Sequence, residues 1–268
     1  MPRFRLDGRV AVVTGALGNL GPVWVDALLE AGASVAGLDL PGAAPNAAFA
    51  RLQAAYDESR LLLLPASVTD REALLQARDT VLSRFGVPSV LVNNAGVDQP
   101  PSAAGGARLE DIPLEVNRRI FEVNTLGLFQ VAQIFGAEMV KAGRGSIVNI
   151  GSLYAAVAPD PRFYEHIVSD PPFLKPPAYG ASKAAVVNLT RYLATAWGGS
   201  GVRVNTLSPG GVLGAQDERF KRKFCDRVPL GRMAEFADLA GPLQFLASDA
   251  SSYVTGTELR VDGGFTAW

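Results

Sequence analysis

Tyr179 and Lys183 are the two residues in this sequence whose types and spacing point most directly to chemistry. They are four positions apart, and residues four apart on a helix lie on the same face. A lysine ammonium beside a phenol favours the phenolate and lowers the tyrosine pKa from about 10 toward the working pH. The pair therefore predicts a general base for an alcohol, or a general acid for a carbonyl. The alternative for the pair alone is an ordinary surface pair on a helix.

Two polar residues earlier in the chain can serve the same reaction. Ser152 follows the apolar run of residues 146–150, and its hydroxyl is placed to hydrogen-bond a reacting oxygen. Asn124 lies in the long helical stretch that precedes this run. Together with Tyr179 and Lys183 they form the predicted catalytic set.

A glycine-rich turn follows the first apolar run of the chain and reads Thr-Gly-Ala-Leu-Gly-Asn-Leu-Gly over residues 14–21. Such a turn between a strand and a helix lets the backbone approach a pyrophosphate at the helix N-terminus. Asn19 stands where a glycine is expected, and asparagine is one of the few other residues that tolerate a left-handed backbone. Pro22 suits the first turn of the following helix, where its missing amide donor costs little.

Asp39 provides the context that a glycine pattern needs. It ends the second apolar run, 24 residues after Gly15, where an acidic residue can accept hydrogen bonds from the adenosine ribose. Its carboxylate would repel a 2′-phosphate, and the chain has no Arg or Lys between Val10 and Asp39. These residues favour NAD over NADP. The alternative for Asp39 is an exposed turn residue.

The overall composition limits the class of protein. The chain has 268 residues, of which 48% are hydrophobic, and a net charge of -1, which favours neither nucleic acid nor an anionic membrane as a partner. The basic run of residues 219–223 is interpreted as a solvated helix face. A single cysteine, the absence of a signal peptide and the absence of an apolar run of about 18 residues lead us to expect a cytoplasmic protein. No Cys/His cluster occurs, so we expect no catalytic metal.

The elements expected between these motifs alternate along the chain. Apolar runs alternate with amphipathic stretches of helix length, as in a doubly wound sheet whose strands are buried on both faces. We therefore predict a single α/β domain over residues 1–268, of Rossmann type, with about seven mostly parallel strands and helices on both faces. The predicted strands are 10–14, 34–39, 61–65, 90–93, 146–150, 202–207 and 258–261.

In kind and order, these pieces resemble the short-chain dehydrogenase/reductase family over nearly the whole chain. The matching pieces are Thr14-Gly15 to Gly21, Asp39, Asn93-Asn94-Ala95-Gly96, Asn124, Ser152, Tyr179, Lys183, Pro209-Gly210 and Asp262-Gly263-Gly264. The resemblance implies that Tyr179 is the acid/base and that Lys183 binds the nicotinamide ribose and tunes Tyr179. It also implies that Ser152 polarises the substrate oxygen and that Asn124 holds a water in the proton relay.

The resemblance further implies a set of cofactor-binding residues. They are Gly15, Leu17, Asn19, Leu20, Gly21, Asp39, Leu40, Ser67, Val68, Asn94, Ala95, Gly96, Tyr179, Lys183, Pro209, Gly210 and Val212. Three positions depart from the family pattern. Asn19 replaces the middle glycine, Ser67 replaces an aspartate that commonly reaches the adenine amine, and no threonine follows Pro209-Gly210.

A proline-rich insert at about 155–177 separates Ser152 from Tyr179 by 27 residues, about twice the spacing expected for the family. A substrate lid is expected at about 212–228. The candidate substrate contacts are Ser152, Tyr154, His166, Tyr179 and Gln216. Other polar groups of the insert, such as Arg162 and Lys175, have two equal interpretations. They hydrogen-bond a polyhydroxylated or anionic substrate, or they belong to a loop that packs on itself or on a second subunit.

The leading hypothesis is an NAD-dependent oxidoreductase that interconverts a secondary alcohol and a ketone, near the gluconate- and sugar-type dehydrogenases. The small-molecule substrate would be a sugar, a sugar acid or a polyol, and the resemblance implies a homo-oligomer, with a tetramer favoured. The alternatives are an NADPH-dependent carbonyl reductase and a dinucleotide-binding regulator without turnover.

Overall fold

The apolar runs of the sequence form one parallel sheet in the computed structural model, which describes residues 2–98 and 107–268. The strand order is β3-β2-β1-β4-β5-β6-β7, and every pair of neighbours is parallel. The strands are β1 (Val10–Thr14), β2 (Ser34–Asp39), β3 (Leu61–Pro65), β4 (Val90–Asn93), β5 (Gly145–Ile150), β6 (Val202–Pro209) and β7 (Glu258–Val261). The predicted fold class is confirmed, and β6 continues two residues beyond its predicted end, through Pro209.

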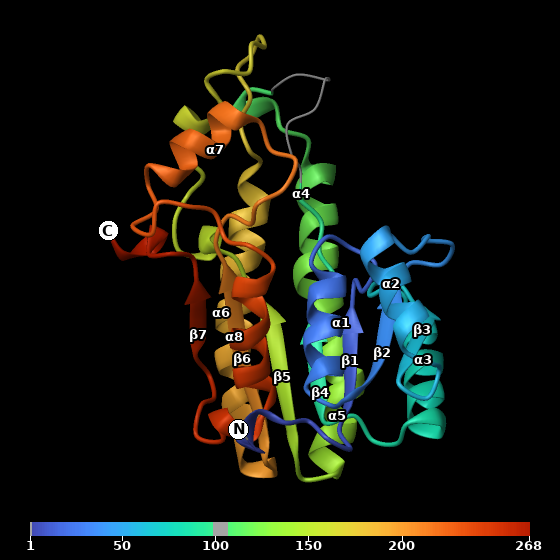
Figure 1. Ribbon diagram of the computed structural model, residues 1–268. Helices are drawn as coiled ribbons and strands as arrows, with labels where there is room; N and C mark the ends of the chain where they lie inside the picture. The colour runs from blue at the N-terminus through green and yellow to red at the C-terminus, as the bar shows by residue number, and fades with distance from the viewer. Residues whose placement is uncertain (1, 99–106) are drawn as a thin grey trace.

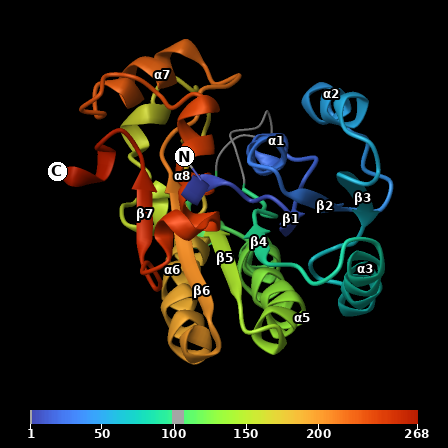
Figure 2. The ribbon, with the colours of Figure 1, turned by 60° about the horizontal axis from the view of Figure 1, so that its bottom comes forward.

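Helices cover both faces of the sheet (Figures 1 and 2). α1 and α8 cover one face, while α3, α5 and α6 cover the other. The helices are α1 (Gly21–Glu30), α2 (Ala47–Ala55), α3 (Arg71–Arg84), α4 (Leu114–Phe121), α5 (Leu128–Lys141), α6 (Pro177–Trp197), α7 (Glu218–Cys225) and α8 (Ala237–Ala247). Proline lies in the first turn of α1 and of α6, as Pro22 predicted.

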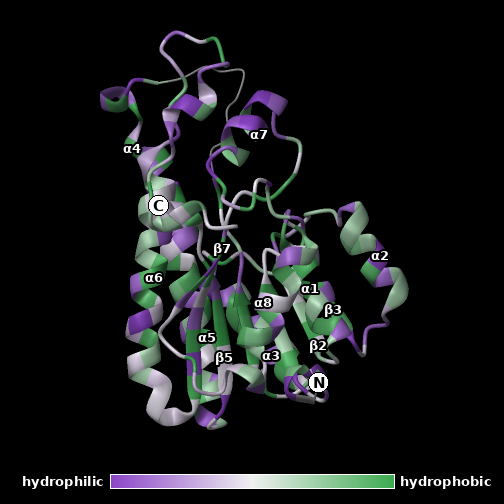
Figure 3. Ribbon diagram, turned by 60° about the vertical axis from the view of Figure 1, so that its left-hand side comes forward, coloured by the Kyte–Doolittle hydropathy of each residue, from purple (hydrophilic) through white to green (hydrophobic). Residues whose placement is uncertain are grey.

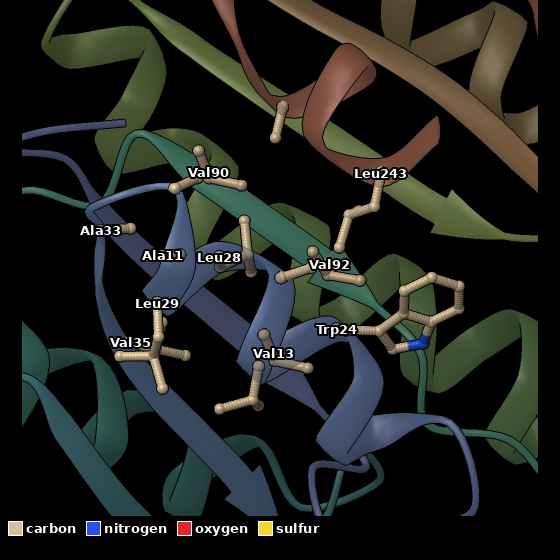
Figure 4. Close-up of a cluster of buried hydrophobic side chains, with 14 of the residues drawn as sticks. Ala11, Val13, Trp24, Leu28, Leu29, Ala33, Val35, Val90, Val92 and Leu243 are labelled. Carbon is tan, nitrogen blue, oxygen red and sulfur yellow. The ribbon is translucent and has the colours of Figure 1, made fainter. Parts of the chain in front are cut away.

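The core consists of two apolar layers, one on each face. Figure 4 shows the layer in which Trp24 and Leu28 of α1 and Leu243 of α8 pack on Val13 and Val92 of β1 and β4. All five side chains are fully buried. The central strands read as nearly continuous apolar runs because both of their faces are covered in this way. Figure 3 shows green on these strands and on helices of the sheet, and purple at β7.

The strand order reverses between β1 and β4, and this reversal positions the site. β1 leads through α1 to β2 on one side, whereas the next half of the chain continues from β4 to the other side. The connections after β1 and β4 therefore diverge and leave a crevice at the carboxyl ends of the strands. Ligands of open α/β sheets bind at this kind of position.

The insert (155–177) packs on the lid (212–228) above the carboxyl ends of the last strands (Figure 1). Phe163 of the insert is 2% exposed, and its ring centroid lies 5.9 Å from that of Phe220, 5.7 Å from that of Phe224 and 6.3 Å from that of Phe265. These side chains belong to a third apolar cluster, separate from the two layers on the sheet. The insert and the lid thus share one small core.

Polar contacts join the same two segments. Lys223 of α7 forms an ion pair with Glu165 at 2.8 Å and also donates to the backbone carbonyl of Arg162. Arg227 approaches Asp160 to 3.2 Å. The packing of the insert on its own chain, one of the two alternatives for its polar groups, is therefore observed.

We predict that Phe163→Ala destabilises the protein by about 3–5 kcal/mol, because the insert and the lid lose the ring that lies between them. Urea denaturation followed by tryptophan fluorescence measures this loss. Phe236→Ala is the matched control, since Phe236 is 44% exposed. Equal stability of the two variants would contradict the shared core.

Candidate active site

A cavity of about 660 Å³ occupies the crevice at the carboxyl ends of the strands. Most of the predicted cofactor residues line it, namely Gly15, Asn19, Leu20, Asp39, Leu40, Ser67, Val68, Asn94, Ala95, Gly96, Tyr179, Lys183, Pro209, Gly210 and Val212. Leu17 and Gly21 do not line this cavity. Their backbone atoms help to shape the glycine-rich turn instead.

The glycine-rich turn is shaped by two close backbone approaches. Gly15 has a φ of 64°, and a Cβ there would lie 2.8 Å from the Cα of Ala95. A Cβ on Gly21 would lie 2.3 Å from the carbonyl oxygen of Ala16. Any larger residue at either position would therefore displace the backbone, as expected of a turn built to approach a phosphate group closely.

Asn19 does not use the left-handed backbone that its residue type allows. Positive φ angles occur only at glycines in the described residues, so that explanation of Asn19 is wrong. The side chain is exposed at the wall of the cavity, where it meets no steric limit. The turn is held by Asn46, whose amide donates to the carbonyls of Leu17 and Gly18 at 3.0 and 3.4 Å. Sequence reasoning missed Asn46.

Asp39 ends β2 and fixes the same turn. One carboxylate oxygen accepts from the Leu17 N–H at 2.7 Å, and the other accepts from the Leu40 N–H at 2.8 Å. These bonds hold the carboxylate at the wall of the cavity in a defined orientation. Asp39 therefore has a structural role in addition to any contact with a ligand.

Ser152 and Tyr179 meet at the end of β5. Ser152 begins a short turn and accepts from the Tyr154 N–H at 3.2 Å, and its hydroxyl lies beside the Tyr179 side chain. Burial raises the pKa of Tyr179 to about 12; the Asp98 carboxylate adds to this rise, while the neighbouring Ser152 hydroxyl opposes it. The pKa of Tyr179 is thus raised, opposite to the direction expected from the Lys183 spacing, because burial is the largest influence on the phenol.

Lys183 is itself deeply buried, at 5% exposure. Its Nζ donates to the carbonyl of Ile150 at 2.8 Å and lies 5.8 Å from the ring centroid of Tyr179. Burial lowers the pKa of this amino group to about 8, and the Asp98 carboxylate partly offsets the effect. Lys183 and Tyr179 therefore share one face of α6, as their spacing predicted, at the inner wall of the cavity.

Asn124 is completely buried and lies in a π-helical turn, Glu122–Gly127, between α4 and α5. Its amide accepts from the Val97 N–H at 2.8 Å and donates to the Val97 carbonyl at 3.0 Å and to the Ser182 hydroxyl at 3.1 Å. Such turns occur mostly at functional sites. Here the turn ties the segment after β4 to α6, and Asn124 does not line the cavity.

A second cavity, of about 700 Å³, lies between the insert and the lid and shares Ser152 and Tyr179 with the first. The predicted substrate residues Tyr154, His166 and Gln216 also line it. The rings of Tyr154 and Tyr179 meet edge to face, with centroids 6.5 Å apart. All of the predicted substrate contacts are therefore brought together at one cavity.

Two of these residues already use polar atoms within their own chain. His166 Nε2 lies 3.2 Å from Asp217, the residue that caps α7. Gln216 accepts from the Gly214 N–H and donates to the Val212 carbonyl, both within the lid. These contacts favour a role for His166 and Gln216 in shaping the lid.

Sequence reasoning missed three charged residues at the site. Asp98 lines both cavities, while Arg119 of α4 and Glu122 of the π-helical turn line the first. The position of Asp98, two residues after Gly96 at the end of β4, was an available signal, because side chains at that edge of the sheet face the crevice. Nothing in the local sequence distinguishes Arg119 from a surface residue of its helix.

Two features are absent from the described ranges, 2–98 and 107–268. No group of three or more His, Cys, Asp or Glu side chains there is arranged to hold a metal ion. None of the helices in these ranges is long and apolar enough to cross a membrane.

A family model described as enoyl-(acyl carrier protein) reductase matches residues 15–266, nearly the whole chain. The chain belongs to the short-chain dehydrogenase/reductase family. It is therefore an enzyme of the group that acts on CH–OH donors.

Named members of the short-chain dehydrogenase/reductase family show substantial identity to this chain. Galactitol 2-dehydrogenase (L-tagatose-forming) of Cereibacter sphaeroides is 38% identical, covering 99% of this chain and 98% of its own. D-threitol dehydrogenase of Mycolicibacterium smegmatis is 36% identical, covering 98% and 95%.

Solved structures of the family have the same fold. A gluconate 5-dehydrogenase from Burkholderia cenocepacia, in complex with NADP and tartrate, has a TM-score of 0.84 and 30% identity, covering 100% of this chain and 98% of its own. A short-chain dehydrogenase from Leptospira borgpetersenii with bound NAD+ has a TM-score of 0.83 and 30% identity, covering 98% and 94%.

The buried Lys183 of this dehydrogenase predicts a pH-dependent stability. Its pKa is lower in the folded chain, about 8, than the ordinary value of 10.5, so the unfolded state binds more protons between these two values. The unfolding free energy should therefore rise with pH in this window, by at most about 1.4 kcal/mol per pH unit.

The test compares wild type with Lys183→Met by urea denaturation between pH 8 and pH 10. The stability of the wild type relative to the variant should increase with pH, because only the wild type titrates at this position. A difference that stays constant or falls over this range would contradict the buried, destabilised ammonium.

Proposed function

We propose that this protein is an NAD-dependent dehydrogenase that interconverts a secondary alcohol of a polyol or sugar with the corresponding ketone. The observation that carries the proposal is that Ser152 and Tyr179 line both cavities. A substrate oxygen in the second cavity can thus reach their hydroxyl groups while its carbon faces the first. The printed names of the galactitol and threitol dehydrogenases support the substrate class.

The first cavity suits a nicotinamide dinucleotide. The glycine turn has no room for Cβ atoms at Gly15 and Gly21, and Asp39 stands at the far end from Lys183 with both oxygens held by backbone N–H groups. Tyr179, Lys183 and Pro209 would flank the nicotinamide end. When bound, the dinucleotide supplies or accepts the hydride; the remaining steps fall to the residues of the chain.

In those steps one proton moves between the substrate oxygen and Tyr179. In alcohol oxidation, Ser152 and Tyr179 hydrogen-bond the substrate hydroxyl, and the Tyr179 oxygen takes its proton. The reverse transfer protonates the ketone oxygen in reduction. Because burial raises the Tyr179 pKa, a nearby positive charge is needed to form the phenolate, and the Lys183 ammonium is the cation on the same helix face.

Asn124 has a different role in this proposal from the one the family resemblance implied. Its amide groups bond Val97 and Ser182 and do not reach the cavity. We assign it a positioning role, in which it fixes the segment after β4 against the helix that carries Tyr179 and Lys183.

Tyr179→Phe should lower kcat by about 10²–10⁴-fold in both directions, because the ring remains but the proton cannot be transferred. Binding of NADH, measured by fluorescence titration, should change little. Tyr192→Phe on the same helix is the control, since Tyr192 is 69% exposed. Undiminished turnover by Tyr179→Phe would refute the proposed acid/base.

Asp39 should set the choice of dinucleotide. We expect wild type to favour NAD over NADP in kcat/KM by roughly 100-fold, because a carboxylate accepts ribose hydroxyl bonds and repels a 2′-phosphate. Asp39→Ser combined with Leu40→Arg should reverse much of this preference, while Asp79→Ser, on the exposed face of α3, should not. Clear NADP preference by wild type would favour the NADPH-dependent reductase instead, as the NADP-bound relative suggests.

The homo-oligomer expected from the resemblance, with a tetramer favoured, stays a prediction. Phe265 near the C-terminus is buried within its own chain, whereas Trp268 is 76% exposed. Leu126 and Tyr192 are also large side chains more than half exposed. These residues support a proposal that part of the surface is covered by further copies of the chain.

A further inference from the structure

Lys175, near the end of the insert, is the second lysine beside the catalytic tyrosine. Its Nζ lies 5.2 Å from the ring centroid of Tyr179 and 5.6 Å from that of Tyr154, and its side chain is only 8% exposed. Lys175 lines the second cavity and not the first, whereas Lys183 lines the first and not the second. The two lysines therefore flank Tyr179 from opposite sides.

Asp98 completes a charged pair with Lys175. Lys175 Nζ donates to Asp98 Oδ2 at 2.5 Å, and both side chains line the second cavity. This bond uses one of the three N–H donors of the ammonium. The pair thus presents a donor and an acceptor side by side, in the cavity that Ser152 and Tyr179 also line.

Both members of the pair are held by elements that also position the catalytic residues. Asp98 follows Val97, whose backbone N–H and carbonyl both bond Asn124. Lys175 precedes Pro176 and Pro177, and Pro177 begins α6 two residues before Tyr179. The fixed φ angles of the two prolines limit the motion of this segment. The backbone at both members of the pair is therefore held in place relative to Tyr179.

We propose that Asp98 and Lys175 bind the hydroxyl group on the carbon next to the one that reacts, so that the enzyme selects vicinal diols and the matching 2-hydroxy ketones. A hydroxyl both donates and accepts, which suits a carboxylate next to an ammonium. Oxygens on adjacent carbons lie about one hydrogen-bond length apart, which matches a pair located beside the residues that hold the reacting oxygen. The inference rests on the proposed function and makes its substrate class more specific.

The pair also explains how a charged lysine can lie in an aromatic environment. The rings of Tyr154 and Tyr179 stabilise an ammonium near their faces, and Asp98 balances its charge. A purely structural ion pair could lie anywhere in the insert, as those of Arg162 with Asp160 and Lys223 with Glu165 do. This one lies in the substrate cavity.

The experiment compares two substrates that differ by one hydroxyl, trans-cyclohexane-1,2-diol and cyclohexanol, with galactitol as a third. The readout is the ratio of kcat/KM for the diol to that for cyclohexanol, with NAD as cofactor. Wild type should prefer the diol by at least about tenfold. Lys175→Met and Asp98→Asn should each lower this ratio by about 10- to 100-fold, the effect of a lost hydrogen bond to a charged group.

Two further variants control for loss of structure. Lys175→Arg keeps the charge and should recover most of the ratio. Lys141→Met removes an exposed ion-paired lysine at the far end of α5 and should leave the ratio unchanged. Thermal melts of each variant show whether the fold is retained.

The outcomes separate this inference from the proposed function. Equal losses on both cyclic alcohols in Lys175→Met would overturn the inference, because the pair would then act on the fold or on Tyr179. A wild type that oxidises galactitol but does not prefer the diol to cyclohexanol would also overturn it and leave the proposed function intact. A wild type that prefers the diol but does not oxidise galactitol would refute the polyol class alone.

Discussion

The hydrogen bond from Lys183 to the carbonyl of Ile150 is the interaction on which the arrangement of the site depends. It joins α6 to the carboxyl end of β5, and Ser152 follows that end by two residues. A buried amino group needs a partner, so a shift of α6 that broke this bond would leave Lys183 unsatisfied in the interior. The free-energy cost of an unsatisfied Lys183 amino group therefore keeps Tyr179 next to Ser152. This holds even though burial disfavours the charged forms of both Tyr179 and Lys183.

Much of the fold and of the first cavity could be predicted from the sequence. The run Val10–Thr14 is buried throughout, and its first four residues are apolar, because the strand is covered on both faces. The Tyr179–Lys183 spacing and Asp39 were equally informative, because a helix turn and a strand end each fix where a side chain lies. Local rules suffice for these positions.

The remaining features depend on contacts between distant segments. The pKa of Tyr179 reflects burial by the whole site, and reasoning from Lys183 alone gave the wrong direction. Asn46 bonds a turn nearly 30 residues earlier in the chain, and Lys175 meets Asp98 across 77 residues. The sequence around each of them contains no sign of its partner. The same holds for His166, which was a substrate candidate and is observed paired with the lid.

The shared core of insert and lid has a consequence for how a substrate enters and leaves. A lid that is disordered in the free enzyme must lose conformational entropy each time it closes. Here Phe163 and its neighbouring rings hold α7 through contacts within the chain itself. The segment therefore loses little freedom on binding, but it must move together with the insert when the cavity opens. Entry and exit of a substrate therefore depend on two segments that move as one, whose shared rings must stay packed or separate together.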